Sequence, residues 1–382
     1  MKSKNKGHEF DQLYCSIKEK KRFYLFGAGD YGRLFLRVMK EEIDILGFLD
    51  NSKEKQQTGY EGYPCFALDQ AAADDETGII LTISQFARPT AMENLKALQL
   101  KKDVDFFLFE EFLSVYYLYR CDKVYMSSIS FLPSTICNLK CRHCLNFNPF
   151  AKTFYKRDFH ALKQDLDLFF EKVDRIMIFH LSGGEPFLYP QIGDLIQYID
   201  KNYGYRIDNF RTVTNGTIVP SKQLLQQLAD ANVEVTIDDY RHAVPQFDDN
   251  FKELIDRFNR YQVKYIINRA DKWVDLAPEN TDYSKMCDMW LAYHYDQCCQ
   301  TWQELRDGKL FYCNYAAYAA VAGLVEETKE ETFDLRKCGM GQKKQLIEFR
   351  LGYSEKGYTE FCKRCRGFTA KNTKEVEPAI QM

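Results

Sequence analysis

The sequence lacks any apolar run approaching the roughly 20 residues that a membrane-spanning helix needs, and residues 1–8 are polar. It also lacks an excess of either charge, because 52 basic and 55 acidic residues leave a net charge of −3. We therefore expect a cytoplasmic protein that binds neither a membrane nor a nucleic acid. A chain of 382 residues exceeds what one hydrophobic core usually organises, so we expect two or three domains, followed by a polar segment from Lys371 onward that frays.

Cysteine, in contrast, is abundant, with 13 residues in the chain. A disulfide framework is not expected in a protein without an export signal, because the cytosol keeps thiols reduced. Metal ligation is therefore the leading explanation for most of the cysteines. Cys15, Cys65, Cys121 and Cys287 have no partner at metal-ligand spacing, and we predict that they are small buried apolar residues.

Strand-like and helix-like segments alternate in residues 1–120, the first predicted domain. The expected strands lie at 22–26, 45–49, 78–84 and 106–109, and the expected helices at 31–40 and 87–98. Such βαβ patterning places strands parallel in a doubly wound sheet of an α/β fold.

A second alternating series fills residues 121–280, the second predicted domain. The expected strands lie at 125–132, 175–181, 209–214, 233–237 and 263–267, and the expected helices at 160–173, 191–202, 221–230 and 250–261. Successive βα units of this kind predict a partial or complete βα barrel. The periodicity breaks in residues 281–382, a cysteine-rich third domain that we expect to need a bound metal cluster in addition to its core.

The loop after the first barrel strand carries a C-x3-C-x2-C array, formed by Cys137, Cys141 and Cys144. Three thiolates so close in sequence can converge on one metal centre, and Fe–S clusters are held by cysteines at such spacings. A 4Fe–4S cluster with only three protein ligands leaves one iron open for a cofactor. The alternatives are a structural zinc site, with His143 as the nearby fourth ligand, and three unrelated buried thiols.

Three further motifs follow at the ends of successive predicted strands: Ser182-Gly183-Gly184-Glu185-Pro186, Thr214-Asn215-Gly216 and Thr236-Ile237-Asp238-Asp239-Tyr240. With these motifs in this order after the C-x3-C-x2-C array, the chain resembles the radical S-adenosylmethionine (radical SAM) superfamily. The resemblance implies a six-unit, partial TIM-type (βα) barrel in which the open iron chelates S-adenosylmethionine. An electron donor such as flavodoxin or ferredoxin would then supply the electron that cleaves this cofactor.

The same resemblance assigns roles to individual residues. It implies that Cys137, Cys141 and Cys144 bind the catalytic 4Fe–4S cluster and that the segment Gly183, Gly184 and Glu185 receives the methionine amino group. The implied cofactor contacts from the other motifs are His143, in the aromatic position before the last cysteine, Asn215, and Thr236 or Asp238 for the ribose hydroxyls.

A second cysteine pattern lies near the end of the chain. Cys298 is followed by Gly308 after nine residues and by Cys313 after four more, and Cys362 and Cys365 form a C-x2-C pair. The pattern resembles the auxiliary-cluster extension called SPASM. Because the full C-x2-C-x5-C-x3-C run is absent, its shorter twitch form with one auxiliary 4Fe–4S cluster is favoured.

Some ligands of this second pattern stay open in the sequence. Either Cys298 or the adjacent Cys299 can be the first ligand, and Cys338 can substitute for one of the four or take no part. A structural zinc site is the alternative, because zinc and Fe–S clusters accept overlapping sulfur ligation.

A glycine loop follows the first strand of the N-terminal domain. Gly27, Gly29 and Gly32 form a G-x-G-x-x-G motif that opens a helix, a context suited to cradling a phosphate, and Asp50 lies at the end of the next strand, where an acid can bond a ribose. This region resembles the Rossmann-like domains of bacterial nucleotide-sugar and surface-polysaccharide enzymes. The alternative is a scaffold whose glycines only allow tight packing.

Taken together, these resemblances imply a radical SAM oxidoreductase-type enzyme. The expected substrate is an activated sugar, such as a nucleotide sugar, that is oxidised, epimerised or dehydrated. Two other functions stay open at this point: a radical SAM peptide maturase, and a non-catalytic Fe–S or zinc protein that binds nucleotide sugars and senses redox state.

Overall fold

The structure is a computed structural model that describes residues 7–71, 74–85, 87–298, 302–369 and 372–382. It groups into two compact units, one comprising residues 5–127 and 340–351 and the other chiefly residues 128–339 and 352–382. The division into three domains at residues 120 and 280 stays a prediction. Within the described ranges, no helix combines the length and the apolar character that crossing a membrane requires.

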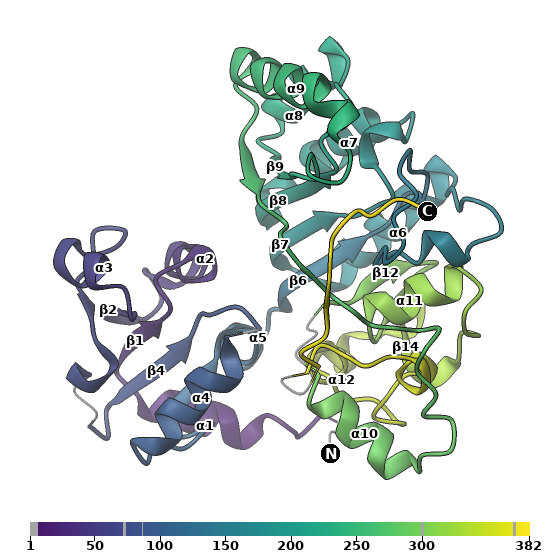
Figure 1. Cartoon of the computed structure of the whole chain (residues 1–382). Helices are drawn as coiled ribbons and strands as arrows, with labels where there is room; N and C mark the ends of the chain where they lie inside the picture. The colour runs from purple at the N-terminus through teal and green to yellow at the C-terminus, as the bar shows by residue number, and fades with distance from the viewer. Residues whose placement is uncertain (1–6, 72–73, 86, 299–301, 370–371) are drawn as a thin grey trace. The chain divides into compact units, whose positions relative to one another are not determined.

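The first unit is built around a parallel sheet with the strand order β3-β2-β1-β4-β5. Its strands are β1 (Arg22–Phe26), β2 (Asp44–Leu49), β3 (Cys65–Phe66), β4 (Thr77–Leu81) and β5 (Phe106–Leu108). Its helices are α1 (Asp11–Glu19), α2 (Asp30–Met39), α3 (Lys53–Thr58), α4 (Arg88–Ala97), α5 (Phe109–Cys121) and α12 (Lys343–Arg350). The strands and helices predicted for this region are confirmed to within a few residues (Figure 1).

The second unit contains the longer sheet, in the order β10-β9-β8-β7-β6-β12-β13-β14. The alternating part comprises β6 (Tyr125–Phe131), α6 (Phe159–Lys172), β7 (Arg175–Leu181), α7 (Ile192–Tyr203), β8 (Ile207–Thr214), α8 (Lys222–Asp230), β9 (Glu234–Asp238), α9 (Asp248–Tyr261) and β10 (Tyr265–Asn268). Strands β7 to β10 pair in parallel, and Figure 1 shows β6 to β9 side by side. The predicted α/β fold with a parallel sheet is therefore confirmed.

The cysteine-rich part of the chain extends this sheet. Its elements are β11 (Trp273–Val274), α10 (Asp288–Asp296), β12 (Glu304–Arg306), β13 (Lys309–Phe311), α11 (Asn314–Val321), β14 (Thr332–Asp334) and β15 (Glu375–Val376). Strand β12 joins β6 in parallel at Glu304 and Ser130, and β13 and β14 continue in antiparallel pairing. This part therefore shares a sheet with the alternating βα units, so the ends of β6 and β7 lie close to α11.

The prediction that the polar segment from Lys371 onward frays is wrong for residues 372–382, while Lys371 itself lies outside the described residues. Strand β15 pairs with β11, and Ala379 is fully buried. The backbone N–H of Arg142 donates to Ile380 O at 2.8 Å, and that of Met382 donates to Lys140 O at 2.9 Å. Residues 372–382 are ordered because two backbone pairings and a buried alanine offset their polar composition.

The four cysteines without metal-ligand spacing are not all buried. Cys65 is buried as predicted, but Cys15, Cys121 and Cys287 are exposed. The prediction is wrong for these three because Cys15 lies on an outer face of α1, Cys121 ends α5 and Cys287 precedes α10.

Candidate active site

The three cysteines of the C-x3-C-x2-C array meet at one cavity of about 330 Å³ in the second unit. The loop after β6 supplies Cys137, Cys141 and Cys144. The ends of β7, β8 and β9 supply the facing wall, whose members include Gly183, Gly184, Thr214, Asn215, Asp238 and Tyr240. Parallel strands end at the same edge of a sheet, so residues from three separate motifs are brought to one place.

Donors from different parts of the chain contact the sulfur atoms. The backbone N–H of Leu139 lies 3.5 Å from Cys137 Sγ and Asn215 Nδ2 lies 3.8 Å from the same atom. Gln381 Nε2 lies 3.5 Å from Cys141 Sγ. Sulfur atoms that accept N–H donors are suited to carry the charge of thiolates bound to a metal.

Burial dominates the electrostatics of these thiols. It raises the pKa of Cys137 to about 12 and that of Cys141 to about 11, and it also raises the pKa of Cys144. Without a cation the three groups would therefore be protonated at neutral pH, whereas a bound metal would convert them to thiolates. This donor set fits the 4Fe–4S cluster that the sequence resemblance implies.

Among the residues that the structure describes, there is no group of three or more His, Cys, Asp or Glu side chains that could hold a single metal ion. A 4Fe–4S cluster is larger than a single ion, and its thiolates bind separate irons. That finding therefore concerns sites for a single ion and not a cluster held on separate irons.

Gly184 is required by the cysteine loop itself. A Cβ atom at this position would lie 2.3 Å from Thr135 O and 2.4 Å from Ile136 O. The backbone N–H of Gly184 donates to Ser134 O at 3.0 Å, and that of Glu185 donates to Ile136 O at 2.7 Å. The glycine pair thus lets the end of β7 approach the backbone that leads into Cys137.

Glu185 is buried behind the cavity, at 1% exposure, and the described residues that line the cavity do not include it. Its carboxylate accepts hydrogen bonds from Thr214 Oγ1 at 2.9 Å, from Asn215 N at 2.8 Å and from Phe187 N at 3.1 Å. Burial raises its pKa to about 7 against these bonds. In this structure Glu185 fixes the end of β8, and its contact with a methionine amino group stays a prediction.

The remaining predicted contacts divide into two groups. Asn215 and Asp238 line the cavity, where Asp238 accepts hydrogen bonds from Tyr240 and Asn268 at 2.8 and 2.7 Å, and burial raises its pKa. Thr236 is not among the described lining residues. His143 lines a separate small cavity instead, with its Nδ1 atom 3.9 Å from Asp275 Oδ1. Of the two ribose candidates, Asp238 is therefore the better placed.

Apart from Tyr240, which ends the third strand-end motif, sequence patterns missed the aromatic wall of the cavity. It is formed by Tyr240, Trp273, Trp302, Tyr315 and Tyr318. The hydroxyl groups of Tyr318 and Ser130 lie 2.6 Å apart, and Tyr318 also donates to Ser182 Oγ at 3.1 Å. The serines had a signal, since they lie near strand ends. Most of the aromatic residues had none, because they come from segments without regular periodicity.

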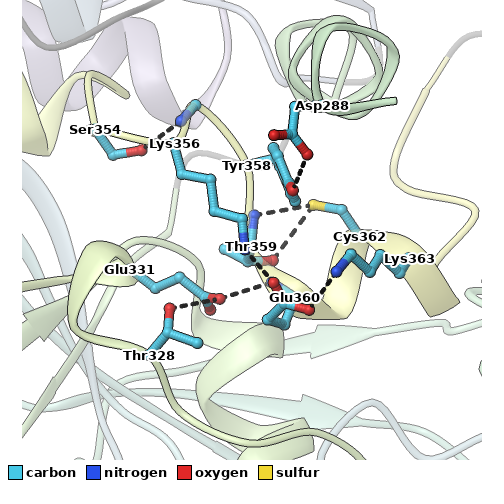
Figure 2. A network of polar contacts seen from close by, with 11 residues as sticks. Asp288, Thr328, Glu331, Ser354, Lys356, Tyr358, Thr359, Glu360, Cys362 and Lys363 are labelled. Carbon is cyan, nitrogen blue, oxygen red and sulfur yellow. Dashed lines mark hydrogen bonds and ion pairs between the residues drawn. The ribbon is translucent and has the colours of Figure 1, made fainter. Parts of the chain in front are cut away.

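The second cysteine pattern also comes together within the second unit. Cys298 and Cys313 pack against a core cluster that contains Cys365. Several of the sulfur atoms accept nearby N–H groups: Phe368 N lies 3.4 Å from Cys298, Gly367 N lies 3.2 Å from Cys365 and Thr359 N lies 3.4 Å from Cys362. Figure 2 shows Cys362 with both its backbone and its hydroxyl contact to Thr359.

Electrostatic coupling indicates that these thiols lie close to one another. Burial is the largest of the causes that raise the pKa of Cys365 well above its ordinary value. The nearby thiols of Cys298, Cys362 and Cys313 raise it further. Burial also raises the pKa of Cys362 to about 12, and Cys298 adds to this rise.

Two other cysteines were candidates for this group. Cys338 is buried, which raises its pKa, and its part in this group stays a prediction. Cys299 lies outside the described residues.

The glycines of the N-terminal loop have different surroundings. Gly27 has φ +119°, and a Cβ atom there would lie 2.9 Å from Thr82 O, whereas one at Gly32 would lie 2.2 Å from Gly27 O. A Cβ atom at Gly29 would meet nothing within 4 Å. Asp50 accepts the backbone N–H of Ala28 at 2.9 Å. Packing thus requires Gly27 and Gly32, while phosphate and ribose binding by this loop stays a prediction.

Comparisons with known proteins bear on the region around the cysteine loop. Residues 131–275 match the family model of the radical SAM superfamily. No curated protein matches the chain at a significant level.

Several solved structures are similar to parts of the chain at low identity. SuiB of Streptococcus suis bound to S-adenosylmethionine is 18% identical with a TM-score of 0.30, over 48% of this chain and 44% of SuiB, so the match spans less than half of SuiB. The enzyme anSMEcpe with bound AdoMet is 13% identical with a TM-score of 0.41, over 66% of this chain and 93% of that one. BtrN in complex with AdoMet and 2-DOIA is 14% identical with a TM-score of 0.37, over 65% and 98%.

Proposed function

We propose that this chain holds a 4Fe–4S cluster through Cys137, Cys141 and Cys144 and cleaves S-adenosylmethionine. The premise is that residues 131–275 form a domain of the radical SAM superfamily of enzymes. When bound, the cluster supplies the electron that splits the sulfonium into methionine and a 5′-deoxyadenosyl radical, which takes a hydrogen atom from the substrate. The observation that carries this proposal is that the three thiols line one cavity with the ends of three parallel strands.

The residues of the chain bind and orient in this proposal. Asn215 and Asp238 face the cavity and offer polar groups to the cofactor, while the buried Glu185 holds the β8 end in place through Thr214 and Asn215. Strands β6 to β10 and their helices would form the partial βα barrel around the site. An external one-electron donor such as flavodoxin or ferredoxin is required, because S-adenosylmethionine cleavage consumes one electron per event.

Cys298, Cys313, Cys362 and Cys365 would hold an auxiliary 4Fe–4S cluster in a twitch-type extension. The support is the mutual electrostatic influence of the four thiols and the N–H donors on their sulfur atoms. Four thiolates satisfy all four irons of a cluster and leave no open site. Such a cluster would accept an electron from the substrate radical or hold the surroundings of the substrate in shape.

The cavity favours a neutral, hydroxyl-bearing substrate. Aromatic rings and uncharged polar groups such as Asn146, Ser182 and Asn314 line it, and none of its described lining residues is Lys or Arg. A sugar ring can pack on aromatic faces and hydrogen-bond to these polar groups. Phosphate groups would find no cation here, so a nucleotide-sugar substrate would place only its sugar part in this cavity. Oxidation, epimerisation or dehydration at a carbinol carbon would each fit.

The N-terminal unit would be a Rossmann-like module that binds a nucleotide sugar. Its parallel strand order and the open space beside Gly29 support this role. Calorimetry of the full chain with common nucleotide sugars tests it. A Gly29→Val variant should lose binding while keeping its thermal unfolding temperature, and the absence of binding to the unchanged chain would remove this part of the proposal.

The main experiment measures 5′-deoxyadenosine after anaerobic reconstitution with iron and sulfide, reduction with dithionite and addition of S-adenosylmethionine. We expect 5′-deoxyadenosine to form, and to gain deuterium when the correct sugar carries deuterium on its reacting carbinol carbon. Failure of any 5′-deoxyadenosine to form would refute the enzyme assignment. Its formation without deuterium transfer from any sugar tested would refute the sugar substrate and favour a peptide.

A further inference from the structure

A strap formed by residues 375–382 crosses the cysteine loop. Cys141 and Gln381 form an antiparallel bridge, flanked by the hydrogen bonds from Arg142 N to Ile380 O and from Met382 N to Lys140 O. Strand β15 at the start of the strap pairs with β11, whose Trp273 lines the cavity. The strap is therefore attached at both ends to parts of the candidate active site.

Ala379 anchors the middle of the strap. It has φ +59°, a left-handed conformation that an L residue adopts at a cost, and it is fully buried. It shares a core cluster with Leu139, Cys141 and Tyr240. An unfavourable backbone conformation persists only where its surroundings fix it, so the packing here determines where the next two residues lie.

The side chain of Gln381 is held at both ends of its amide group. Its Oε1 atom accepts the backbone N–H of Lys140 at 2.8 Å, which orients Nε2 toward Cys141 Sγ, 3.5 Å away. Nε2 also donates to Ala379 O. Gln381 thus places an N–H dipole beside one particular thiol of the array, from a position 240 residues distant in sequence.

We infer that Gln381 is a positioning residue that sets the reduction potential of the catalytic cluster through its hydrogen bond to Cys141. This inference rests on the proposed function. Reduction adds negative charge to a cluster, and an N–H donor on a ligating sulfur stabilises that charge. Loss of the donor therefore makes the cluster harder to reduce, and a carboxylate in its place makes it harder still.

Gln381→Leu and Gln381→Glu test the inference by redox titration of the catalytic cluster, followed by electron paramagnetic resonance. The catalytic signal is the one that changes when S-adenosylmethionine is added. We expect the reduction equilibrium to fall about tenfold in Gln381→Leu, which is a shift of about 59 mV to lower potential for one electron, and to fall further in Gln381→Glu. The Glu variant has the shape of the native residue and keeps the acceptor for Lys140 N–H, so it tests the inference even where the Leu variant assembles poorly.

Glu377→Gln is the matched control, because it changes one charge at an exposed position of the same strap. We expect it to leave the potential unchanged. A potential equal to that of the unchanged chain in Gln381→Glu, or an equally large shift in Glu377→Gln, would overturn the inference. If the unchanged chain shows no signal that responds to S-adenosylmethionine, it is the proposed function that fails, so the two failures are distinguishable.

Discussion

Cys137, Cys141 and Cys144 come from one short loop and border a cavity. Cys298, Cys313 and the pair Cys362 and Cys365 come from three separate segments and pack into two core clusters, with Cys362 in one and the other three in the second. Two of the donors to the first group are side-chain amides from remote positions, Asn215 and Gln381. Most donors to the second group are backbone N–H groups near the cysteines themselves, such as Thr359 and Gly367.

This difference separates two tasks. In the proposed function the first site admits a cofactor and leaves one side open, so its ligands would depend on support from strand ends and from the strap. A site with four cysteine ligands can be closed, and local backbone then suffices. We therefore expect changes in the first group to stop cofactor cleavage, and changes in the second to act mainly on turnover of the substrate.

The largest effect is expected from Cys141→Ala. Removal of one of three ligands should abolish formation of 5′-deoxyadenosine, by at least about 10³-fold, the scale of loss when a member of a catalytic unit is removed. The measurement is chromatographic quantification of 5′-deoxyadenosine from anaerobically reconstituted protein. Cys121→Ala, at an exposed position at the end of α5, serves as the control and should retain full activity. Full activity of Cys141→Ala would refute the assignment of this array.

Cys365→Ala should reduce turnover of the substrate more than cleavage of the cofactor. We expect some cleavage of S-adenosylmethionine to persist, turnover of the substrate to be lost, and about four fewer iron atoms per chain to be bound. The measurements are iron content and the ratio of product to 5′-deoxyadenosine. Cys287→Ala is the control, because this cysteine lies in the same part of the chain but is exposed. Loss of zinc instead of iron in Cys365→Ala would show that the second group is a structural zinc site.

Many of the strands and helices, and the division of the cysteines into two groups, could be predicted from the sequence. The strands β1 and β7 followed from short continuous apolar runs, because they are buried on both faces, and the helices between strands followed from apolar stripes at helical spacing. The division of the cysteines into two groups followed from spacing, since the first group is local and the second is marked by Gly308 and a C-x2-C pair, while their role as metal ligands stays a prediction.

Other features could not be predicted because they depend on tertiary contacts without a local signal. Gly184 was assigned to the cofactor, but the contact that its lack of a side chain permits in the structure is with Thr135 and Ile136. Gln381 lies in a polar segment whose composition predicted fraying, and only its pairing with the cysteine loop gives it a position. Aromatic residues such as Trp302 and Tyr318 come from segments whose periodicity is broken.

Substitution of the glycine pair should show how strongly the first group depends on the end of β7. A Cβ atom in Gly184→Ala would meet two carbonyl oxygens at 2.3 and 2.4 Å, whereas one in Gly183→Ala would come no closer than 3.2 Å to Ser134 O. We expect Gly184→Ala to displace the cysteine loop at a cost of about 1–3 kcal/mol and to lower the occupancy of the catalytic cluster. Gly183→Ala should have a clearly smaller effect on iron content and on 5′-deoxyadenosine formation. Equal effects of the two variants would contradict the packing argument.

The smallest expected effect concerns Glu331, which supports the second group. Its carboxylate accepts the backbone N–H of Glu360 at 2.7 Å and the hydroxyl of Thr328 at 3.1 Å, close to Cys362 (Figure 2). Burial raises its pKa from 4.5 to about 7. The folded state therefore holds this proton more tightly than the unfolded state, so its contribution to stability is fully present below about pH 4.5 and is lost as the pH rises through about 7.

Glu331→Gln should remove this dependence, because the amide keeps an acceptor oxygen but does not titrate. We expect the fall in the free energy of unfolding between pH 4.5 and 7 to become smaller by about 1–2 kcal/mol. Urea unfolding at a series of pH values under anaerobic conditions measures it. Glu330→Gln, at the exposed neighbouring position, should leave the pH profile unchanged. If the Glu331 variant and the unchanged chain show the same pH profile, Glu331 stays ionised when buried. The closed environment of the second group would then contain a negative charge beside its cysteines.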